Sequence, residues 1–190
     1  MKTRVRGIGA LATLTVMIIW LNGTFGAGKT STAKELVSLI PEAHYFDPEQ
    51  VGFMLRHISG LPEVGDFQHW RPWRGLVVET ASQVLKYVGG VLVMPQSVLV
   101  EQYWEEIRTG LREAGIPLRH FVLHADEITL TQRIESDVVD IGARQWRLDH
   151  LPKYRESFTW LSREGEVIDT AAVSPSEVAK DIAAAIDPTL

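Results

Sequence analysis

The sequence predicts an α/β fold in which helices cover both faces of a five-stranded, mostly parallel sheet. Two observations support this prediction: short apolar segments alternate with helical segments along the chain, and a glycine-rich loop follows the first of them. Apolar runs of this length are typical of strands buried in a parallel sheet. The expected strands cover residues 16–21, 44–47, 91–94, 120–123 and 166–169.

The segments between these strands show the spacing of one apolar helix face. Ala33, Leu36, Val37 and Ile40 lie at positions i, i+3, i+4 and i+7 of one helix. Similar patterns predict helices over residues 77–88, 100–114 and 151–161, and another beginning near 126. A final helix is expected after Ser-Pro-Ser-Glu (174–177), which has the form of a capping box.

Two segments, 59–74 and 135–150, interrupt this alternation. Both are polar or aromatic, and both are long for plain connections in a compact domain. In a parallel α/β sheet, ligands bind beyond the carboxyl ends of the strands. We therefore expect both segments to be functional flaps at that edge.

Composition limits the classes of function. The chain of 190 residues is 45% apolar and 23% charged, which is typical of a soluble globular domain. Its net charge of −5 gives no basic field for nucleic acid, so no nucleic-acid partner is expected. The chain has no cysteine, which excludes disulfides, thiolate catalysis and cysteine-ligated zinc.

The amino terminus allows two interpretations. Lys2, Arg4 and Arg6 precede an apolar run up to Leu21, a layout that secretory signals share. The run is short for a membrane span, and cleavage near residue 21 would remove the strand that must precede the glycine loop. We therefore interpret residues 1–16 as an extension, disordered or upstream of a start at Met17, and residues 17–190 as one domain without an integral membrane segment.

The glycine-rich loop Gly-Thr-Phe-Gly-Ala-Gly-Lys-Thr (23–30) matches the phosphate-binding pattern G-x-x-x-x-G-K-[ST] in full. Glycines allow positive φ and turn backbone N–H groups inward, and the next helix adds its positive end. We expect Lys29 to contact the outer phosphates of ATP and Thr30 to bind the accompanying Mg²⁺. The residues expected to contact the nucleotide are Gly23, Thr24, Phe25, Gly26, Ala27, Gly28, Lys29, Thr30 and Ser31.

Asp47 follows the second expected strand, near the glycine loop in such a sheet. Its carboxylate could orient an acceptor hydroxyl and take its proton. The alternative is a helix cap, because Asp47-Pro48-Glu49-Gln50 has the form of a helix start with proline at its first position. Both roles are compatible, and the position at a strand end favours the catalytic one.

Further acceptor contacts are expected from the first flap and from the third strand end. The segment DFQHWRPWR (66–74) offers a flat, cationic surface that suits a planar ring with an anionic group, although tryptophans at helical spacing also serve as core packing. The third strand ends at Met94-Pro95-Gln96-Ser97 and lacks the aspartate of many ATPases, which weakens a motor or hydrolase interpretation. The candidates are Asp66, Phe67, Trp70, Arg74 and Gln96.

The chain resembles the tunicamycin-resistance ATP-binding protein family. The resemblance rests on IIWLNGTFGAGKTSTAKEL, FDPEQVGFMLR, DFQHWRPWR and VIDTAAVSPSEVA, and it extends from Met17 to Ile186. More broadly the chain is similar to the shikimate kinases and nucleoside monophosphate kinases. This resemblance implies a P-loop kinase fold, an acceptor-binding aspartate at Asp47 and an arginine at Arg56 that holds an anionic group of the acceptor, although a solvated Arg56 is an equal alternative.

The resemblance also implies a lid after the fourth strand. Arg133 is the candidate for stacking on the base or for the lid, and Arg144 and Arg147 are the candidates for phosphate contacts, where they would stabilise the transferred group. Surface positions are the alternative for all three. His120 and His124 lie on an expected buried strand without a metal-binding pattern, so core positions are favoured over metal ligation.

These observations predict a small phosphotransferase that moves the γ-phosphoryl group of Mg·ATP to a hydroxyl of a small acceptor. The resemblance suggests tunicamycin or a related nucleoside-like compound as the acceptor, and antibiotic resistance as the role. Two alternatives remain: a protein that sequesters the drug without chemistry, and a regulatory NTPase, which the flap disfavours. Because the protein is expected to use ATP, we predict a cytoplasmic location. The acyl tail of tunicamycin could bring the protein to a membrane surface. The sequence does not predict the oligomeric state.

Overall fold

The computed structural model describes residues 16–139 and 141–186. Its five strands are all parallel and have the order β2-β3-β1-β4-β5. The predicted fold class is confirmed, and every expected strand is present, with ends shifted by at most two residues. The strands are β1 (Met17–Asn22), β2 (Ala43–Tyr45), β3 (Val91–Pro95), β4 (Leu118–His124) and β5 (Glu166–Asp169).

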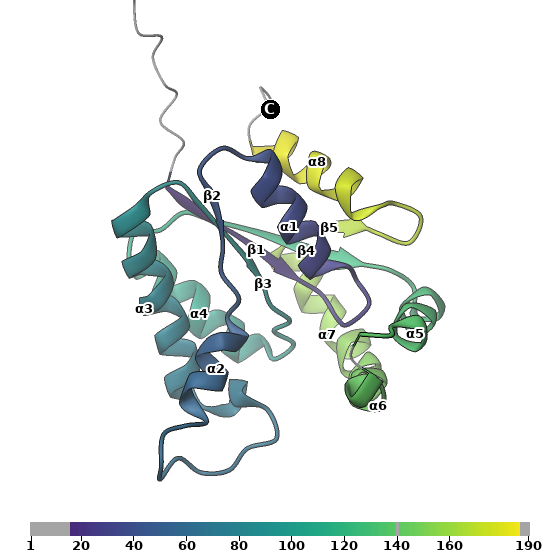
Figure 1. The fold of residues 1–190 in the computed structure, drawn as a ribbon, viewed down its shortest axis with the longest axis horizontal. Helices are drawn as coiled ribbons and strands as arrows, with labels where there is room; N and C mark the ends of the chain where they lie inside the picture. The colour runs from purple at the N-terminus through teal and green to yellow at the C-terminus, as the bar shows by residue number, and fades with distance from the viewer. Residues whose placement is uncertain (1–15, 140, 187–190) are drawn as a thin grey trace, which may run out of the picture.

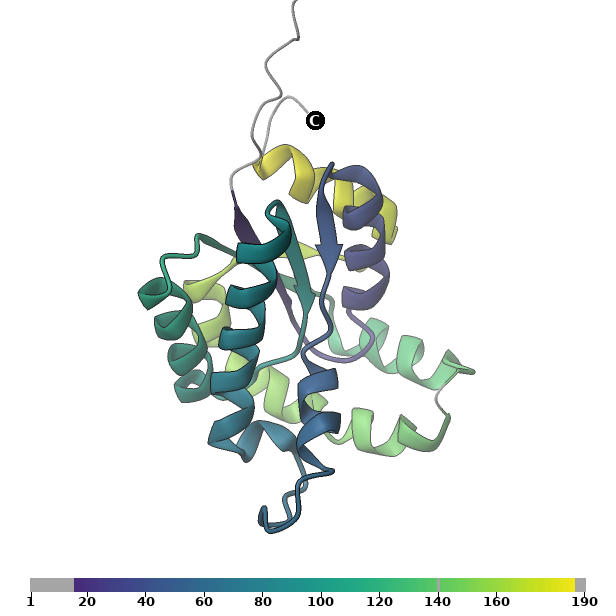
Figure 2. The same cartoon turned by 60° about the vertical axis from the view of Figure 1, so that its left-hand side comes forward.

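Helices cover both faces of this sheet (Figure 1). The helices α1 and α8 pack together on one face, and α3, α4 and α7 lie on the other, as the turned view in Figure 2 shows. The α-helices are α1 (Lys29–Leu39), α2 (Glu49–Leu55), α3 (Arg71–Val88), α4 (Glu101–Glu113), α5 (Glu127–Ser136), α6 (Arg144–Leu148), α7 (Leu151–Glu164) and α8 (Pro175–Ile186), and the 3-10 helices are η1 (Phe67–His69) and η2 (Ile141–Ala143).

Strand β1 is the centre of the core. Ile18, Ile19, Trp20 and Leu21 have no exposed surface, because β3 and β4 flank the strand and helices cover both of its faces. Full burial on both faces explains why the sequence of this strand is continuously apolar rather than alternating. The strand interpretation of residues 16–21 is confirmed. The expected extension covers residues 1–16, of which residues 1–15 lie outside the described part of the chain.

The two expected flaps form from loops and short helices. Helix α3 begins at Arg71, six residues before the expected start, because Trp70 is extended and Pro72 lies in the first turn, where its missing N–H costs nothing. The indole of Trp73 is fully buried, so the end of the first flap belongs to the core. The second flap forms η2 and α6, which follow α5 on the right in Figure 1.

Two smaller predictions concern helix capping and the histidines. Ser174 and Glu177 form the expected capping box: the Ser174 N–H donates to the Glu177 carboxylate and the Glu177 N–H donates to the Ser174 hydroxyl. His120 is buried against Trp104, with ring centroids 3.9 Å apart, and burial lowers its pKa to about 4. His124 stacks on Phe158 and contacts the Tyr154 hydroxyl. In the described chain, no helix combines the length and apolar character needed to cross a membrane.

Candidate functional site

The glycine-rich loop joins the central strand β1 to the start of α1. Gly23, Gly26 and Gly28 have φ of 128°, 79° and 89°, in the region that side chains other than glycine avoid. A Cβ on Gly23 would lie 2.4 Å from the carbonyl oxygen of Leu123, so the loop passes directly against β4. The expected positive φ angles are confirmed, and the glycines serve both the turn and the close approach to β4.

Asn22 anchors the start of this loop. Its side-chain Oδ1 accepts hydrogen bonds from the N–H groups of Gly23 and Val98, at 2.8 and 2.9 Å, and its Nδ2 donates to the Val98 carbonyl. The side chain is completely buried, and each of its hydrogen-bonding groups has a partner. It therefore locks the loop to the segment that follows β3, which lines the cavity described below.

Lys29 is the first residue of α1, and its side chain turns back over the loop. Its Nζ donates to the Thr24 carbonyl at 2.7 Å and lies 5.6 Å from the centroid of the Phe25 ring. Burial is the main reason that the pKa of Lys29 falls to about 8; the nearby Arg147 lowers it further, whereas Glu49 opposes the shift. A phosphate group would supply this desolvated ammonium with a further anionic partner beside Glu49.

The first turn of α1 fits a nucleotide with its metal ion. Thr30 and Ser31 are exposed at the helix N-terminus, where backbone N–H groups and the helix dipole favour anions. Within residues 16–139 and 141–186 no group of three or more His, Asp and Glu side chains could hold a metal ion. A metal here would take Thr30 as a protein ligand and its other ligands from phosphate and water, which is how Mg²⁺ usually binds with nucleotides.

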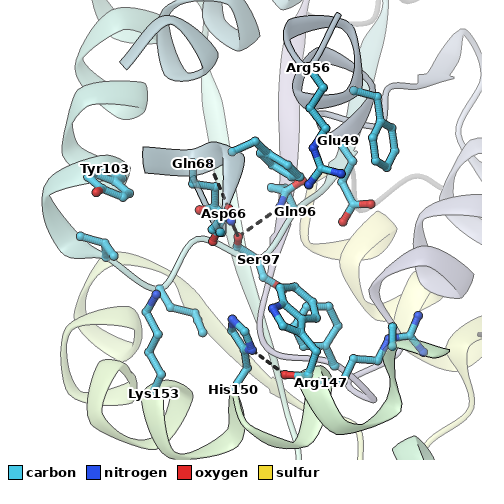
Figure 3. Close-up of a pocket in the computed structure, with 18 residues that line it drawn as sticks. Glu49, Arg56, Asp66, Gln68, Gln96, Ser97, Tyr103, Arg147, His150 and Lys153 are labelled. Atoms are coloured by element: carbon cyan, nitrogen blue, oxygen red, sulfur yellow. Dashed lines mark hydrogen bonds between the residues drawn. The ribbon is translucent and has the colours of Figure 1, made fainter. Parts of the chain in front are cut away.

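A cavity of about 320 Å³ opens on one side of the loop (Figure 3). Side chains from five segments line it: the loop itself, α2, residues 65–68, residues 96–103 and residues 143–153. Among its residues are the expected Arg56, Asp66, Phe67 and Gln96. The structure therefore brings these four together although they lie on three separate segments.

Glu49 rather than Asp47 lines this cavity. Asp47 accepts hydrogen bonds from the Glu49 N–H at 3.0 Å and from the Gln50 side chain at 3.3 Å, so it caps the start of α2. The Glu49 carboxylate interacts electrostatically with Lys29 and Arg147, and burial, helped by Asp47, raises its pKa. The capping alternative describes Asp47, and the group that faces the loop is two residues further along the chain.

Trp70 and Arg74 do not line the cavity. The Trp70 indole is buried, and its N–H donates to the Pro62 carbonyl, so it holds the loop that precedes η1. Arg74 pairs with Glu106 at 2.6 Å, donates to the Gln68 carbonyl and lies over the Tyr103 ring at 4.2 Å. Its donors are directed at the protein itself, which makes Arg74 a support for the wall of the cavity.

The opposite wall comes from the lid formed by α6 and the start of α7. Arg147 donates to the Asp137 carboxylate at 2.7 Å, and its guanidinium carbon lies 5.8 Å from the Phe25 ring centroid. Phe25 also meets Trp146 edge-on, with centroids 4.9 Å apart. The phosphate loop and the lid are therefore joined through one aromatic side chain. Arg144 lies outside the cavity, and its side chain donates to the Asp137 carbonyl at 3.3 Å.

A second cavity, of about 220 Å³, lies against the other side of the loop. It is lined by loop residues 26–28, Thr32, Arg133 and residues after β5. Arg133 donates to the carbonyls of Gly26, Thr170 and Ala171, at 3.2, 2.6 and 3.2 Å. These bonds fix the guanidinium plane beside the cavity and connect the loop to the end of β5.

Several cavity residues gave no signal in the sequence. Tyr103, Trp146, His150 and Lys153 line the large cavity, but each lies on a helix or flap without a recognisable motif. Gln68 also lines it; it lies within the segment 66–74 that the sequence singled out, but it was not among the expected contacts. Glu49 offered a weak signal, since it stands two residues after Asp47 in a segment already expected at the site. The remaining residues become visible only when the segments that carry them are brought together.

No protein-family model matches the chain, and the comparison with curated proteins gives no match either. Solved structures do match. A gluconokinase from Sinorhizobium meliloti 1021 has a TM-score of 0.60 and 18% identity, over 93% of this chain and 94% of the kinase. A shikimate kinase from Acinetobacter baumannii has a TM-score of 0.55 and 18% identity, over 94% and 97%. The fold is therefore that of the P-loop kinases.

A third solved structure matches with a higher TM-score and a higher sequence identity than these two kinases. The tunicamycin resistance protein of Deinococcus radiodurans has a TM-score of 0.68 and 29% sequence identity, over 90% of this chain and 96% of that protein. The expected resemblance is thus confirmed over nearly the whole domain.

Proposed function

We propose that the protein is an ATP-dependent phosphotransferase that moves the γ-phosphoryl group to a hydroxyl of a small molecule bound in the large cavity. One observation carries the proposal: the Glu49 carboxylate lines the large cavity and interacts electrostatically with Lys29 of the phosphate loop. A phosphate-binding ammonium and a carboxylate with a raised pKa are the two groups that phosphoryl transfer to a hydroxyl requires. The fold of the P-loop kinases supports the same conclusion.

The chain's own residues have distinct roles in this proposal. The loop N–H groups and Lys29 hold the phosphates of ATP, and Thr30 holds Mg²⁺, which neutralises charge on the phosphates. Glu49 orients the acceptor hydroxyl and accepts its proton. The new bond forms between the acceptor oxygen and the γ-phosphorus, and the bond from that phosphorus to the oxygen bridging to the β-phosphorus breaks. Arg147 stabilises the charge of the group in transfer.

The second cavity would receive the base of the nucleotide. Arg133 has its guanidinium plane fixed by three carbonyl oxygens, which suits it for stacking on a planar ring. The loop separates this cavity from the acceptor cavity, so the triphosphate would run along the loop from one to the other. In this arrangement the two ends of the nucleotide would occupy separate sites.

For the acceptor we propose tunicamycin or a related nucleoside-like compound, and resistance to that antibiotic as the biological role. The likeness to the tunicamycin resistance protein of Deinococcus radiodurans supports this choice, as do the aromatic and charged side chains of the cavity. Because the reaction consumes ATP, we propose that it takes place in the cytoplasm.

The direct test is transfer of label from γ-labelled ATP to tunicamycin, uridine and N-acetylglucosamine, each with and without magnesium. We expect labelled product from at least one acceptor and none from Lys29→Ala. A protein that binds ATP and drug, protects cells and transfers no label would instead be a sequestering protein. If calorimetry detects no binding of ADP or ATP, the proposed phosphotransferase activity is contradicted.

A further inference from the structure

Gln96 is held rigidly at the point where β3 opens onto the acceptor cavity. Its backbone N–H donates to the Leu21 carbonyl at 3.0 Å, and its own carbonyl accepts from the Trp20 indole N–H at 3.0 Å. Both contacts come from the central strand β1, and Gln96 is only 4% exposed. The backbone that carries this side chain is therefore fixed by hydrogen bonds to the core.

The side-chain amide of Gln96 leaves one atom without a partner. Its Nε2 donates to the Ser97 carbonyl at 3.2 Å, which directs the amide nitrogen toward the backbone. Its Oε1 is buried and has no hydrogen-bond partner among the described residues, although Gln96 lines the cavity. A buried carbonyl oxygen without a donor destabilises a protein, and such an atom in a well-packed site indicates a ligand or an ordered water.

The groups beside Gln96 also offer acceptors to the cavity. Gln68 donates its amide Nε2 to the same Ser97 carbonyl at 2.9 Å, and Asp66 contributes a carboxylate that accepts from the Gln68 N–H. Figure 3 shows Asp66, Gln68 and Gln96 grouped around Ser97. This wall therefore presents oxygen acceptors, and Arg56, which also lines the cavity, lies close to Gln96 in Figure 3.

The facing wall carries mainly hydrogen-bond donors. Arg147, His150 and Lys153 come from the lid and from α7, and Figure 3 shows them on the other side of the cavity from Gln96. Lysine and arginine side chains donate hydrogen bonds and accept none. A hydroxyl both donates and accepts, so a molecule with several hydroxyls can satisfy both walls at once. Aromatic faces from Phe67 and Tyr103 also line the space, and such faces pack against the C–H face of a sugar ring.

We propose that Gln96 is a specificity-determining residue whose Oε1 accepts a hydrogen bond from a second hydroxyl of a sugar-like acceptor. This hydroxyl is distinct from the one that receives the phosphoryl group near Glu49. The inference rests on the proposed function and adds the acceptor class to it: a polyhydroxylated ring, either free or as the sugar part of a nucleoside. A site built to hydrogen-bond a hydroxyl rejects analogues that lack it, because the buried partner is then left unpaired.

The test compares Gln96→Leu with the wild type and with Gln83→Leu, a matched change on the exposed face of α3. Binding is measured by calorimetry for ADP, tunicamycin, uridine, 2′-deoxyuridine, 3′-deoxyuridine and N-acetylglucosamine. We expect the wild type to prefer a hydroxylated probe over its deoxy partner by about tenfold, the effect of one hydrogen bond. Gln96→Leu should lose this preference and bind ADP as before, and Gln83→Leu should resemble the wild type in every measurement.

Thermal unfolding without ligand shows whether Gln96 recognises the acceptor or only stabilises the fold. Gln96→Leu removes an unpaired carbonyl from the interior, and the Ser97 carbonyl, which loses the Gln96 donor, keeps the one from Gln68. The melting temperature of the variant should therefore equal or exceed that of the wild type. A lower melting temperature together with weaker ADP binding would show that Gln96 only supports the fold. Retained hydroxyl preference in Gln96→Leu, or no probe bound by a wild type that binds ADP, would overturn the proposal. A wild type that does not bind ADP would instead contradict the proposed phosphotransferase activity.

Discussion

The two cavities beside the phosphate loop differ in how their walls are made. The smaller one is formed largely by backbone, glycine and small apolar side chains, and Arg133 is the one charged side chain among the described residues that line it. The larger one gathers charged and aromatic side chains from five segments. The smaller cavity thus offers few distinct contacts, as a site for a common nucleotide can, whereas the larger one has the chemistry to select a particular molecule.

The sharpest test of this contrast is Glu49→Gln against Asp47→Asn. We expect Glu49→Gln to lower the rate of phosphoryl transfer by roughly 10²- to 10⁴-fold, as loss of a general base does, with unchanged affinity for ADP. Asp47→Asn keeps a capping side chain and should change the rate by less than about fivefold. The measurement is label transfer under single-turnover conditions. If Asp47→Asn lowers the rate more than Glu49→Gln does, Asp47 is the catalytic carboxylate and Glu49 is not the general base.

Lys29→Met tests the loop that separates the cavities. Removing the charge should lower the transfer rate by roughly 10²- to 10³-fold, the range found when a transition-state donor is lost. Lys34, exposed on the same helix, provides the control, and Lys34→Met should leave the rate unchanged. Rates at saturating ATP separate this effect from weaker binding. Equal rates in Lys29→Met and the wild type would show that Lys29 does not contribute to phosphoryl transfer.

The pH dependence of nucleotide binding probes the same lysine. With its pKa at about 8, Lys29 loses its proton in the free protein as the pH rises, whereas bound phosphates favour the charged form. Binding then requires uptake of a proton, so the affinity for ADP should be level below pH 8 and about tenfold weaker at pH 9 than at pH 7. Titration calorimetry of Lys29→Met should show a flat profile over this range; a parallel decline in the variant would assign the effect to another group.

A smaller effect is expected in the simpler cavity. Arg133→Gln should weaken ADP binding by about fivefold, near 1 kcal/mol, the size of one stacked cation. Inorganic tripolyphosphate, which has no base, should lose less affinity than ADP. Equal losses for both ligands would mean that Arg133 acts by holding the Gly26 carbonyl rather than by contacting the base.

The sequence predicted the fold and the phosphate loop because both are encoded by local patterns. The central strands β1 and β3 are nearly continuous apolar runs, and the loop is a single contiguous motif whose glycine angles follow from its residue types. The capping box at Ser174 is local in the same sense. These features need no knowledge of which distant segments meet, so one chain of residues is sufficient to find them.

The acceptor cavity could be predicted only in part. Asp66 and Phe67 were found from one unusual segment, Gln96 from a strand end, and Arg56 from the family resemblance. The sequence could not separate Glu49 from Asp47, because the choice depends on which carboxylate the start of α2 uses as a cap. Nor could it show that Glu106, thirty-two residues away on α4, engages the guanidinium of Arg74.

The contact between Phe25 and Trp146 gives the protein a built-in optical reporter. The indole of Trp146 is 45% exposed and rests against a ring carried by the phosphate loop itself. Occupancy of the loop alters the surroundings of that ring, so the emission of this one tryptophan will follow nucleotide binding without an added dye. Subtracting the signal of Trp146→Phe isolates it from the other five tryptophans of the chain.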